Sequence, residues 1–594
     1  MRGLTKRWIG HEEAAARGGT LVERVLAARG LGEPEAREAF LNPSLLGLHD
    51  PSGIPNLDRV AGRLLEAARG GERVVIYGDY DADGVTASAI LVRALKAVAP
   101  GADVSAYLPH RLEEGYGLNG DALRELASDG ARVVVSVDCG VTAVAEARLA
   151  RELGLELFIT DHHNPPASMT DLPDALVVHP RHPESMYPFG ELCGAGVAFK
   201  LAWRIATLRA GGERVPGALR ETLLDLLGLA ALGTVADVVP LVDENRAITA
   251  FGLRRLAAAR LPGVRALMEA SSVGKNDVDA EAAGFRLGPR LNAAGRMGHA
   301  KDALELLLTE DDARAAELAA QLDALNTERR SVERRISEEA AEMAVSAGMT
   351  SDDRRAIVLA HPEWHPGVIG IVCSRLVETF GRPVILMQED GGVCKGSCRS
   401  IDGFNICAAL GECSALLSTF GGHDMAAGLS LAREDFAAFR EAFTERANAG
   451  LTVDELAAGV RVDACVSADE LTAENARELA RLAPFGRSNP RPTLLLEGAV
   501  VAEHAGVMGG NGRHLQMRLE RPGGPAVRAL AWNWGERVSR FRRGDRIDAL
   551  VRLRLNEWRG RVSAECELID ARLGGEPGVV VRAGVSRPTS SCPS

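Results

Sequence analysis

The sequence lacks the features that identify three familiar classes of protein. Its 10 cysteines form no CxxC pair, which excludes a zinc ribbon and a thioredoxin-type motif. Its first residues include no apolar segment of the kind found in signal peptides. The most apolar stretch, residues 223–242, carries Asp225 and Asp237, which favours a buried helix over a membrane span. We therefore expect reduced thiols, no membrane association and a cytoplasmic location.

An excess of positive charge is also missing. The formal net charge of −12 argues against a polyanionic partner, since nucleic acids prefer basic surfaces. The argument stays open, because carboxylates that bind cations add to the acidic count without repelling a substrate. There is no Walker loop, GxSxG elbow or HExxH motif, and GAGVAF at 194–199 is too weak a pattern to predict a nucleotide-binding loop.

Length and pattern predict a multidomain α/β protein. At about 150 residues per domain, a chain of 594 residues forms three to five units. Three β-branched runs, 73–78, 132–137 and 155–160, alternate with helical segments at 84–98 and 142–153. This alternation is typical of a parallel sheet covered by helices. Such sheets bind ligands beyond the carboxyl ends of their strands, and an acidic cluster directly follows each run.

The first cluster is Asp79, Asp81 and Asp83. Carboxylates this close repel one another by about 1 kcal/mol per pair or more, so we expect a cation to hold them. A calcium loop is the structural alternative, but its twelfth position needs glutamate, and this sequence has Ile90 there. Asp138, which follows the second run, is placed to bridge two ions.

The third cluster is the triplet Asp161, His162 and His163. Mixed aspartate and histidine ligation favours manganese, with magnesium as the alternative, unless both histidines only cap the strand end. Asp237 stands in an apolar stretch, where an unpaired carboxylate costs several kcal/mol, so it is either another ligand or a helix cap. Together these residues predict a two-metal phosphoesterase that hydrolyses its substrate by in-line attack of water.

Ten motifs carry a family resemblance. Four resemble the signatures of the DHH phosphoesterases: DYDADG (79–84), VDCG (137–140), DHH (161–163) and TVADVVPL (234–241). Six more extend the likeness to roughly residues 50–570 and resemble the RecJ family of bacterial single-strand-specific 5′ to 3′ DNA exonucleases. They are RLEEGYGL (111–118), PRLNAAGRM (289–297), WHPGVIGIVCSRL (364–376), KGSCRS (395–400), FGGHDMAAG (420–428) and APFGRSNPRP (483–492).

The resemblance implies two α/β lobes, joined by a long helix and followed by an OB-type β-barrel. The Ala-, Glu- and Arg-rich segment 302–348 suits the helix, and glycine-rich turns are expected at 391–396 and 421–422. Strand-like segments after about residue 458 suit the barrel. The expected domains are an N-terminal segment (1–50), a DHH catalytic domain (51–300), connecting helices (301–350), a DHH-associated substrate-binding domain (351–455), an OB-fold domain (456–574) and a tail (575–594).

The resemblance also assigns roles to residues. Two divalent cations would be held by Asp79, Asp81, Asp83, Asp138, His162 and Asp237, with Asp138 as the bridge. The implied catalytic set is Asp81, Asp83, Asp138, His162, His163 and Asp237. Asp79 and His163 can act either at the ions or on the substrate. The implied substrate contacts are Arg111, Tyr116, Asn292 and Arg296 in the first lobe, Ser397 and Arg399 on the 5′ phosphate, and His423 beside the scissile phosphate.

The last expected domain is locally basic, although the net charge of the chain is negative. Between Arg537 and Arg561 the sequence has nine arginines against three acidic residues, interleaved with aromatic residues. An OB-type groove uses such strands to follow a nucleic-acid backbone and stack its bases, although some of the rings must instead fill the core. The aromatic residues concerned are Trp532, Trp534, Phe541 and Trp558.

The function implied is release of 5′-mononucleotides from single-stranded DNA in recombination and repair, with the strand lying in a cleft too narrow for a duplex. The alternatives are a DHH enzyme acting on short oligoribonucleotides, cyclic dinucleotides or RNA 5′ ends, and an inactive DNA-binding scaffold. Family analogy adds single-strand-binding protein and a RecQ-type helicase as partners of a monomer. Ser488 departs from the family pattern, since relatives usually carry glycine there.

Overall fold

The computed structural model describes residues 1–10, 14, 18–212, 214–520 and 526–574. The expected tail at 575–594 and the side chain of Trp558 lie outside the described residues. The chain forms two compact units, which we describe one at a time. The catalytic unit comprises residues 43–334 and 484–490, and the C-terminal unit comprises the described residues of 1–42, 335–483 and 491–574. Among the described residues, no helix is both long and apolar enough to cross a membrane.

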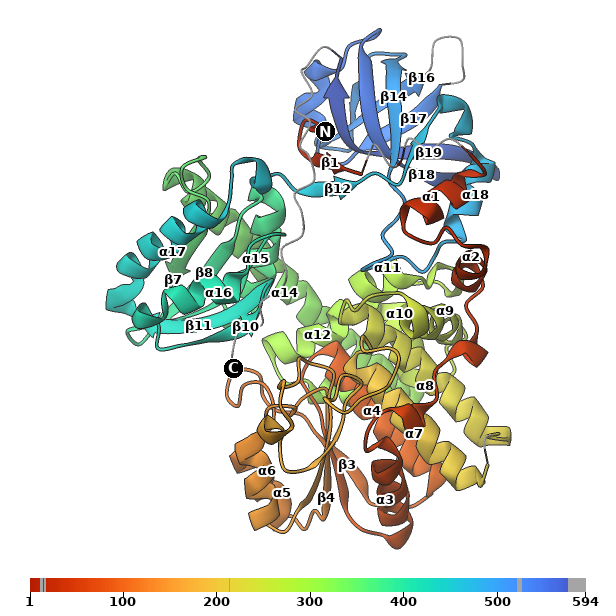
Figure 1. The fold of residues 1–594 in the computed structure, drawn as a ribbon, viewed down its shortest axis with the longest axis vertical. Coiled ribbons are helices and arrows are strands. Elements are labelled where there is room, and N and C mark those ends of the chain that lie inside the picture. Colours follow the sequence, from red (N-terminus) through yellow and green to blue (C-terminus); the bar gives the residue numbers. More distant parts are fainter. Residues whose placement is uncertain (11–13, 15–17, 213, 521–525, 575–594) are drawn as a thin grey trace. The chain divides into compact units, whose positions relative to one another are not determined.

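The catalytic unit is built around a five-stranded parallel sheet of order β3-β2-β4-β5-β6. Both faces are covered, which is why every residue of β2 and β4 is buried. Val74 and Ile76 belong to the core that includes α3, α4 and α7, whereas Val75 and Tyr77 belong to the cluster with α5 and α6. Figure 1 shows these helices beside the sheet. The elements are α3 (Leu57–Gly70), β2 (Val74–Tyr77), α4 (Ala82–Val98), β3 (Val104–Tyr107), α5 (Gly120–Ser128), β4 (Val133–Val137), α6 (Val144–Glu152), β5 (Glu156–Thr160), β6 (Leu176–Val178) and α7 (Gly194–Ala210).

Helices complete the catalytic unit. The apolar stretch at 223–242 lies largely in α8, which is buried over residues 226–234, as the sequence predicted. The predicted helix at 302–348 is two helices, α13 and α14, because Asp311 accepts from the N–H of Ala313 and starts α14 afresh. The elements are α8 (Gly217–Ala236), α9 (Asp243–Ala257), α10 (Pro262–Ala270), α11 (Ala280–Ala282), a π-helical turn η6 (Ala283–Leu287), α12 (Gly288–Met297), α13 (Lys301–Leu308) and α14 (Asp312–Ser346).

The C-terminal unit contains a mixed five-stranded sheet of order β10-β11-β9-β8-β7. The turn expected at 421–422 is wrong, since both glycines lie within β10 and pair with β11. A Cβ at Gly422 would meet the carbonyl oxygen of Ala426 at 2.4 Å, so glycine lets the two strands approach. The elements are β7 (Ile357–His361), α15 (Pro366–Phe380), β8 (Val384–Asp390), β9 (Val393–Arg399), α16 (Ile406–Glu412), β10 (Thr419–His423), β11 (Ala426–Ala432) and α17 (Phe436–Gly450).

The OB domain is a sheet that closes on itself. Its order is β13-β14-β18-β19-β17-β16-β15, and a further pairing of β14 with β16 closes five of the strands into a ring. The pairings are mostly antiparallel, as expected, but β17 runs parallel to β19. The elements are β13 (Ala464–Val466), α18 (Ala473–Ala480), β14 (Leu494–Val501), β15 (Gly506–Met508), β16 (His514–Glu520), β17 (Val527–Ala531), β18 (Arg546–Trp558) and β19 (Arg561–Leu573).

The N-terminal segment is part of the same unit. Strand β1 (Arg7–Ile9) pairs in parallel with β12 (Gly459–Arg461). Trp8 is buried, and its Nε1–H donates to Asp570 at 2.8 Å. Helices α1 (Leu21–Ala28) and α2 (Pro34–Leu41) follow, and Arg29 forms an ion pair of 2.9 Å with Asp463.

Candidate metal centre and substrate contacts

Backbone amides hold the carboxylates of Asp81 and Asp83. Asp81 caps α4, where its Oδ1 accepts from the N–H of Asp83 at 2.9 Å and of Gly84 at 3.1 Å. Asp83 reaches the start of α7, and its two oxygens accept from the N–H of Gly194 at 2.7 Å and of Ala195 at 2.9 Å. These amides and the positive end of the helix dipole stabilise a carboxylate that is only 1% exposed.

The glycines around Asp83 allow this close packing. A Cβ on Gly194 would lie 2.6 Å from the Cβ of Asp138, and a Cβ on Gly233 would lie 2.6 Å from Oδ1 of Asp83. Only glycine fits at either position. The GAGVAF segment, which the sequence left without a function, is therefore the support for an acidic ligand. Sequence reasoning missed this function because the partner is Asp83, more than 100 residues away.

Asp138 follows β4 in a left-handed backbone conformation, with φ of 63°. Aspartate adopts this conformation more readily than most residues, so the strain is small. Its N–H donates to the carbonyl of Thr160 at 3.0 Å, and its own carbonyl accepts from the hydroxyl of Tyr116 at 3.1 Å. The side chain is 2% exposed and therefore has a fixed position.

Asp161 organises the loop that carries the two histidines. Its Oδ1 accepts from the backbone N–H of His162 at 2.7 Å and of His163 at 3.1 Å, and it lies 2.7 Å from Nδ1 of His163. Its Oδ2 accepts from the N–H of Val141 at 2.9 Å. Asp161 therefore fixes the backbone of the loop, whereas His162 and His163 offer their rings to the site.

His179 and Arg181, from the loop after β6, hold the same segment from the other side. The N–H of Arg181 donates to Nδ1 of His179 at 2.9 Å, so the proton of the neutral ring lies on Nε2 and donates to the carbonyl of His163 at 2.7 Å. The guanidinium of Arg181 donates to the carbonyl of His162 at 2.5 Å and to Oδ1 of Asn164 at 3.0 Å. The sequence analysis missed both residues, and the HPRH segment at 179–182 was the signal available.

The ligand atoms converge. Nε2 of His162 lies 3.1 Å from Oδ1 of Asp138, 3.7 Å from Oδ2 of Asp237 and 3.9 Å from Oδ2 of Asp83. Within the described part of the chain, His162 Nε2, Asp138 Oδ1 and Asp79 Oδ1 are buried without a hydrogen-bond partner. Buried polar atoms of this kind call for a ligand, and these fit divalent cations such as Mn²⁺ or Mg²⁺. The three sets of neighbouring ligand atoms are Asp138, His162 and His163; Asp83, His162 and Asp237; and Asp79, Asp81 and Asp138.

The pKa shifts of the carboxylates also indicate a site for cations. Burial, together with the charges of Asp83 and Asp81, raises the pKa of Asp237 to about 9. Burial and the charge of Asp81 raise the pKa of Asp83 to about 6, and burial raises the pKa of Asp138 and of Asp79 as well. Such repulsion among buried carboxylates is relieved when a cation binds.

The two histidines of the triplet differ in charge. Burial and the neighbouring charge of His163 lower the pKa of His162 to about 3, so its ring is neutral and has a lone pair for a metal ion. Burial also disfavours the charged form of His163, but the hydrogen bond to Asp161 outweighs it and raises the pKa of His163 to about 9. His163 is therefore a proton-carrying donor at neutral pH.

Arg111 lies over the ring of Tyr80, and Arg296 is within electrostatic range of the same residue. The guanidinium of Arg111 is 4.7 Å from the centre of this ring. Burial and the charge of Asp79 raise the pKa of Tyr80 to about 12, while the charges of Arg111 and Arg296 oppose the rise. The two arginines thus place positive charge beside the loop that carries the first acidic cluster.

The other two predicted substrate contacts of this unit also support the metal centre. The hydroxyl of Tyr116 lies 3.0 Å from Nδ1 of His163, and its side chain is 52% exposed. Oδ1 of Asn292 accepts from the N–H of Ala82 at 2.8 Å, which fixes the first turn of α4. Tyr116 and Asn292 therefore connect the rim of the site to the residues that hold the acidic clusters.

Ser397, Arg399 and His423 belong to the C-terminal unit. Ser397 and Arg399 lie two residues apart on β9, so they project from the same face of the sheet. The side chain of Arg399 donates to the carbonyl of Cys398 at 2.8 Å. A Cβ on Gly370, in α15, would be 3.3 Å from Oγ of Ser397 and 3.5 Å from Nη2 of Arg399, so this glycine leaves room for both side chains.

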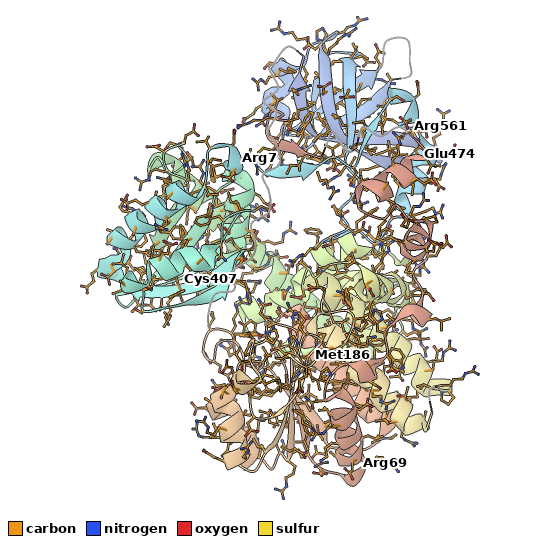
Figure 2. All side chains as sticks on the ribbon, viewed as in Figure 1. Arg7, Arg69, Met186, Cys407, Glu474 and Arg561 are labelled. Atoms are coloured by element: carbon orange, nitrogen blue, oxygen red, sulfur yellow. The ribbon has the colours of Figure 1, made fainter. Side chains whose placement is uncertain are left out.

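The aromatic residues of the OB domain divide between core and surface. Trp534 and Phe541 are buried with their rings stacked at 6.1 Å, so they fill the core. Trp532 is 43% exposed and meets His514 edge to face. Arginines are carried by β18 and β19, with Arg561 at the start of β19 (Figure 2). Trp532 is thus the described tryptophan of this cluster that can stack on a base.

Family models match three parts of the chain: the DHH family N-terminal domain at residues 73–234, the DHHA1 domain at 353–449 and the RecJ OB domain at 462–570. The single-stranded-DNA-specific exonuclease RecJ of Bacillus subtilis is 39% identical over 553 residues, which cover 93% of this chain and 68% of that protein. The RecJ of Escherichia coli is 35% identical over 568 residues, covering 92% of this chain and 94% of its own length.

A solved structure agrees with the sequence relatives. The crystal structure of Thermus thermophilus RecJ in complex with Mn²⁺ matches with a TM-score of 0.77 and 34% identity, covering 98% of this chain and 81% of that one. The same protein in complex with Mg²⁺ gives a TM-score of 0.72 at 33% identity, covering 98% and 80%. The chain belongs to the RecJ family of DHH phosphoesterases.

Proposed function

We propose that the chain is a single-stranded-DNA-specific 5′ to 3′ exonuclease that releases 5′-mononucleotides by two-metal hydrolysis in DNA recombination and repair. The observation that carries this proposal is the convergence of His162 Nε2 with Asp138, Asp237 and Asp83 within 3.9 Å, in a chain of the RecJ family. Divalent cations bound at such a centre activate a water for attack and neutralise charge on the phosphoryl group.

The residues of the chain take separate parts in this reaction. Asp81, Asp83, Asp138, His162 and Asp237 would hold the cations, and Asp79 would complete the set with Asp81 and Asp138. His163, protonated at neutral pH, donates to a phosphate oxygen, with Asp161 keeping its ring oriented. Arg111 and Arg296 bind phosphates of the strand.

The 5′ end has its own binding site in this proposal. Ser397 and Arg399 on β9 bind the 5′ phosphate, because serine is a compact donor and arginine offers a planar fork that matches phosphate oxygens. His423, at the end of β10, adds a donor for the scissile phosphate. Capture of the 5′ phosphate sets the direction of degradation.

The test uses purified full-length protein with manganese and three matched 3′-labelled substrates: single-stranded DNA, single-stranded RNA and blunt duplex DNA. We expect mononucleotide release from single-stranded DNA and none in EDTA. Equal rates on duplex and single strand would refute the specificity. Faster cleavage of RNA would favour the alternative function on RNA 5′ ends or short oligoribonucleotides.

The OB domain provides a second binding surface in this proposal. Trp532 stacks a base, and the arginines of β18 and β19 follow the phosphate backbone. Trp532→Ala should weaken binding to long strands more than to short oligonucleotides, measured by fluorescence anisotropy over a range of salt. This variant is preferable to removing the domain, since removal would expose Trp8 of the N-terminal segment.

Family analogy supports three further parts of the proposal. The protein acts in the cytoplasm as a monomer, with single-strand-binding protein and a RecQ-type helicase as partners. Light scattering after size-exclusion chromatography tests the oligomeric state, and co-elution of the purified proteins tests each partner.

A further inference from the structure

The side chain of Phe285 is an exposed aromatic ring to which the proposed function assigns no role. Its side chain is 80% exposed, whereas the next most exposed phenylalanine in the described residues, Phe420, is at 40%. A ring of this size left in water forfeits the stabilisation that burial would give it. A single exposed aromatic is not unusual, so its place in the fold decides whether it matters.

The backbone at Phe285 is irregular. Residues 283–287 form the π-helical turn η6, directly before α12. Turns of this type are rare and occur often at functional sites. Cβ atoms on Gly284 and Gly288 would each lie 3.3 Å from a side chain at the end of α8, Val235 and Ala236 respectively. The turn is therefore packed against the two residues that immediately precede Asp237.

Helix α12 connects this turn to residues beside the metal centre. Asn292 accepts from the N–H of Ala82, and a Cβ on Gly295 would meet the carbonyl oxygen of Tyr80 at 2.5 Å. Phe285 precedes Arg296 by 11 residues, which places their backbones about 15 Å apart along the continuous helix formed by η6 and α12. Arg296 in turn lies within electrostatic range of Tyr80.

The charged side chains next to Phe285 are already engaged. Arg286 donates to the carbonyl of Ser271 at 2.6 Å. Arg290 donates to Asp323 at 2.8 Å and to the carbonyl of Arg286 at 2.7 Å. The chemistry that this position offers is therefore a flat apolar face without a neighbouring phosphate-binding fork.

We propose that Phe285 stacks on a nucleobase of the substrate strand, on the 3′ side of the cleaved bond. The proposal rests on the proposed function: when the product is a mononucleotide, a single nucleotide lies 5′ of the cut, so a contact at η6, beyond the start of α12, falls on the 3′ side. The ligand is a base of any sequence, since every base has a face on which a ring can stack. Arg296 and Phe285 then hold the phosphate backbone and a base from one helix.

The experiment compares aromatic and aliphatic substitutions in the full-length protein. Phe285→Leu should raise the KM for single-stranded DNA about fivefold to a hundredfold, because one stacked base contributes about 1 to 3 kcal/mol. Phe285→Tyr should stay close to the wild type. The manganese concentration for half-maximal activity should not change in either variant. Leu46→Ala is the matched control, since Leu46 is an apolar side chain of the same unit with 97% exposure.

A binding measurement gives an independent readout. A strand with 2-aminopurine at successive positions, added in EDTA, should show one position whose fluorescence is quenched by the wild type and recovers with Phe285→Leu. An unchanged KM for Phe285→Leu, an equal defect in Phe285→Tyr, or the same defect in Leu46→Ala would overturn the stacking contact. If the wild type itself fails to degrade single-stranded DNA, the proposed function has failed instead.

Discussion

The metal centre and the proposed 5′-phosphate site on β9 and β10 of the C-terminal unit are built in opposite ways. At the centre, Asp83 and Asp138 are at most 2% exposed, and backbone amides or buried rings hold the loops around them. At the other site, every residue of β10 is exposed, and Ser397 and Arg399 of β9 are only partly buried. Groups that bind cations need fixed positions, whereas groups that grip a flexible strand gain from open ones.

Removal of one charge from the proposed metal site is the largest test of this contrast. Asp138→Asn keeps the side-chain shape and tolerates the left-handed backbone, so we expect a folded protein. Its kcat on single-stranded DNA should fall by about a thousandfold or more, since cation binding contributes several kcal/mol to transition-state stabilisation. The exposed Asp121→Ala in the same unit is the control. A kcat close to that of the wild type would show that the centre lies elsewhere.

The loop that braces the histidines gives the next effect. His179→Ala removes the donor to the carbonyl of His163, so the manganese needed for half-maximal activity should rise about tenfold to a hundredfold. His179→Gln keeps an N–H near the same place and should restore part of the affinity. At saturating manganese the KM for DNA should be normal. A manganese titration identical to that of the wild type would mean that the loop holds its shape without His179.

A variant of the proposed 5′-phosphate site should change the KM for DNA and not the manganese requirement. Arg399→Ala should raise the KM for a 5′-phosphorylated strand about tenfold, because a hydrogen bond to a charged group contributes about 1.5 kcal/mol or more. The same variant should no longer distinguish 5′-phosphate from 5′-hydroxyl ends, and its manganese titration should be unchanged. Arg433→Ala, whose partner on the same sheet is Glu389, is the control. A shift in the manganese titration would contradict the separation of the two sites.

The smallest effect is on stability. Burial and neighbouring charges raise the pKa of Asp83 to about 6 and of Asp237 to about 9, above the value near 4 of an unfolded aspartate. The metal-free protein therefore binds more protons when folded, so this stability is present at low pH and is lost as pH rises from about 4 towards 9. The melting temperature in EDTA should fall by a few degrees over that range, and manganese should remove most of the fall. A flat profile in EDTA would show that the carboxylates repel one another less than their spacing implies.

Local pattern was enough to predict the sheet and the position of the acidic clusters along its edge. Strands β2, β4 and β5 were recognisable as β-branched runs, and their parallel pairing brings Asp79, Asp138 and Asp161 to one edge. The motif order gave the same residues by resemblance. Recognising the strand pattern and the motif order does not depend on contacts between distant parts of the chain. Both could therefore be read from the linear sequence.

Contacts between distant residues could not be predicted. The amides of Gly194 and Ala195 meet Asp83 across more than 100 residues, and no periodicity marks that pairing. The strand at 421–422 was hidden because glycine is as common in turns as in close strand pairs. Ser488 was noted only as a departure, yet its φ of 61° explains why glycine is usual there.

The pairing of Trp8 with Asp570 has a consequence for how the chain is made. The two residues are 562 positions apart, so a ribosome adding about 5 to 20 residues per second delivers the partner about 30 to 110 s after Trp8. During that time β1 also waits for β12, while the catalytic unit can already fold on the sequence between them. The tryptophan is therefore an exposed apolar group on every nascent chain until the last strand of the OB domain arrives.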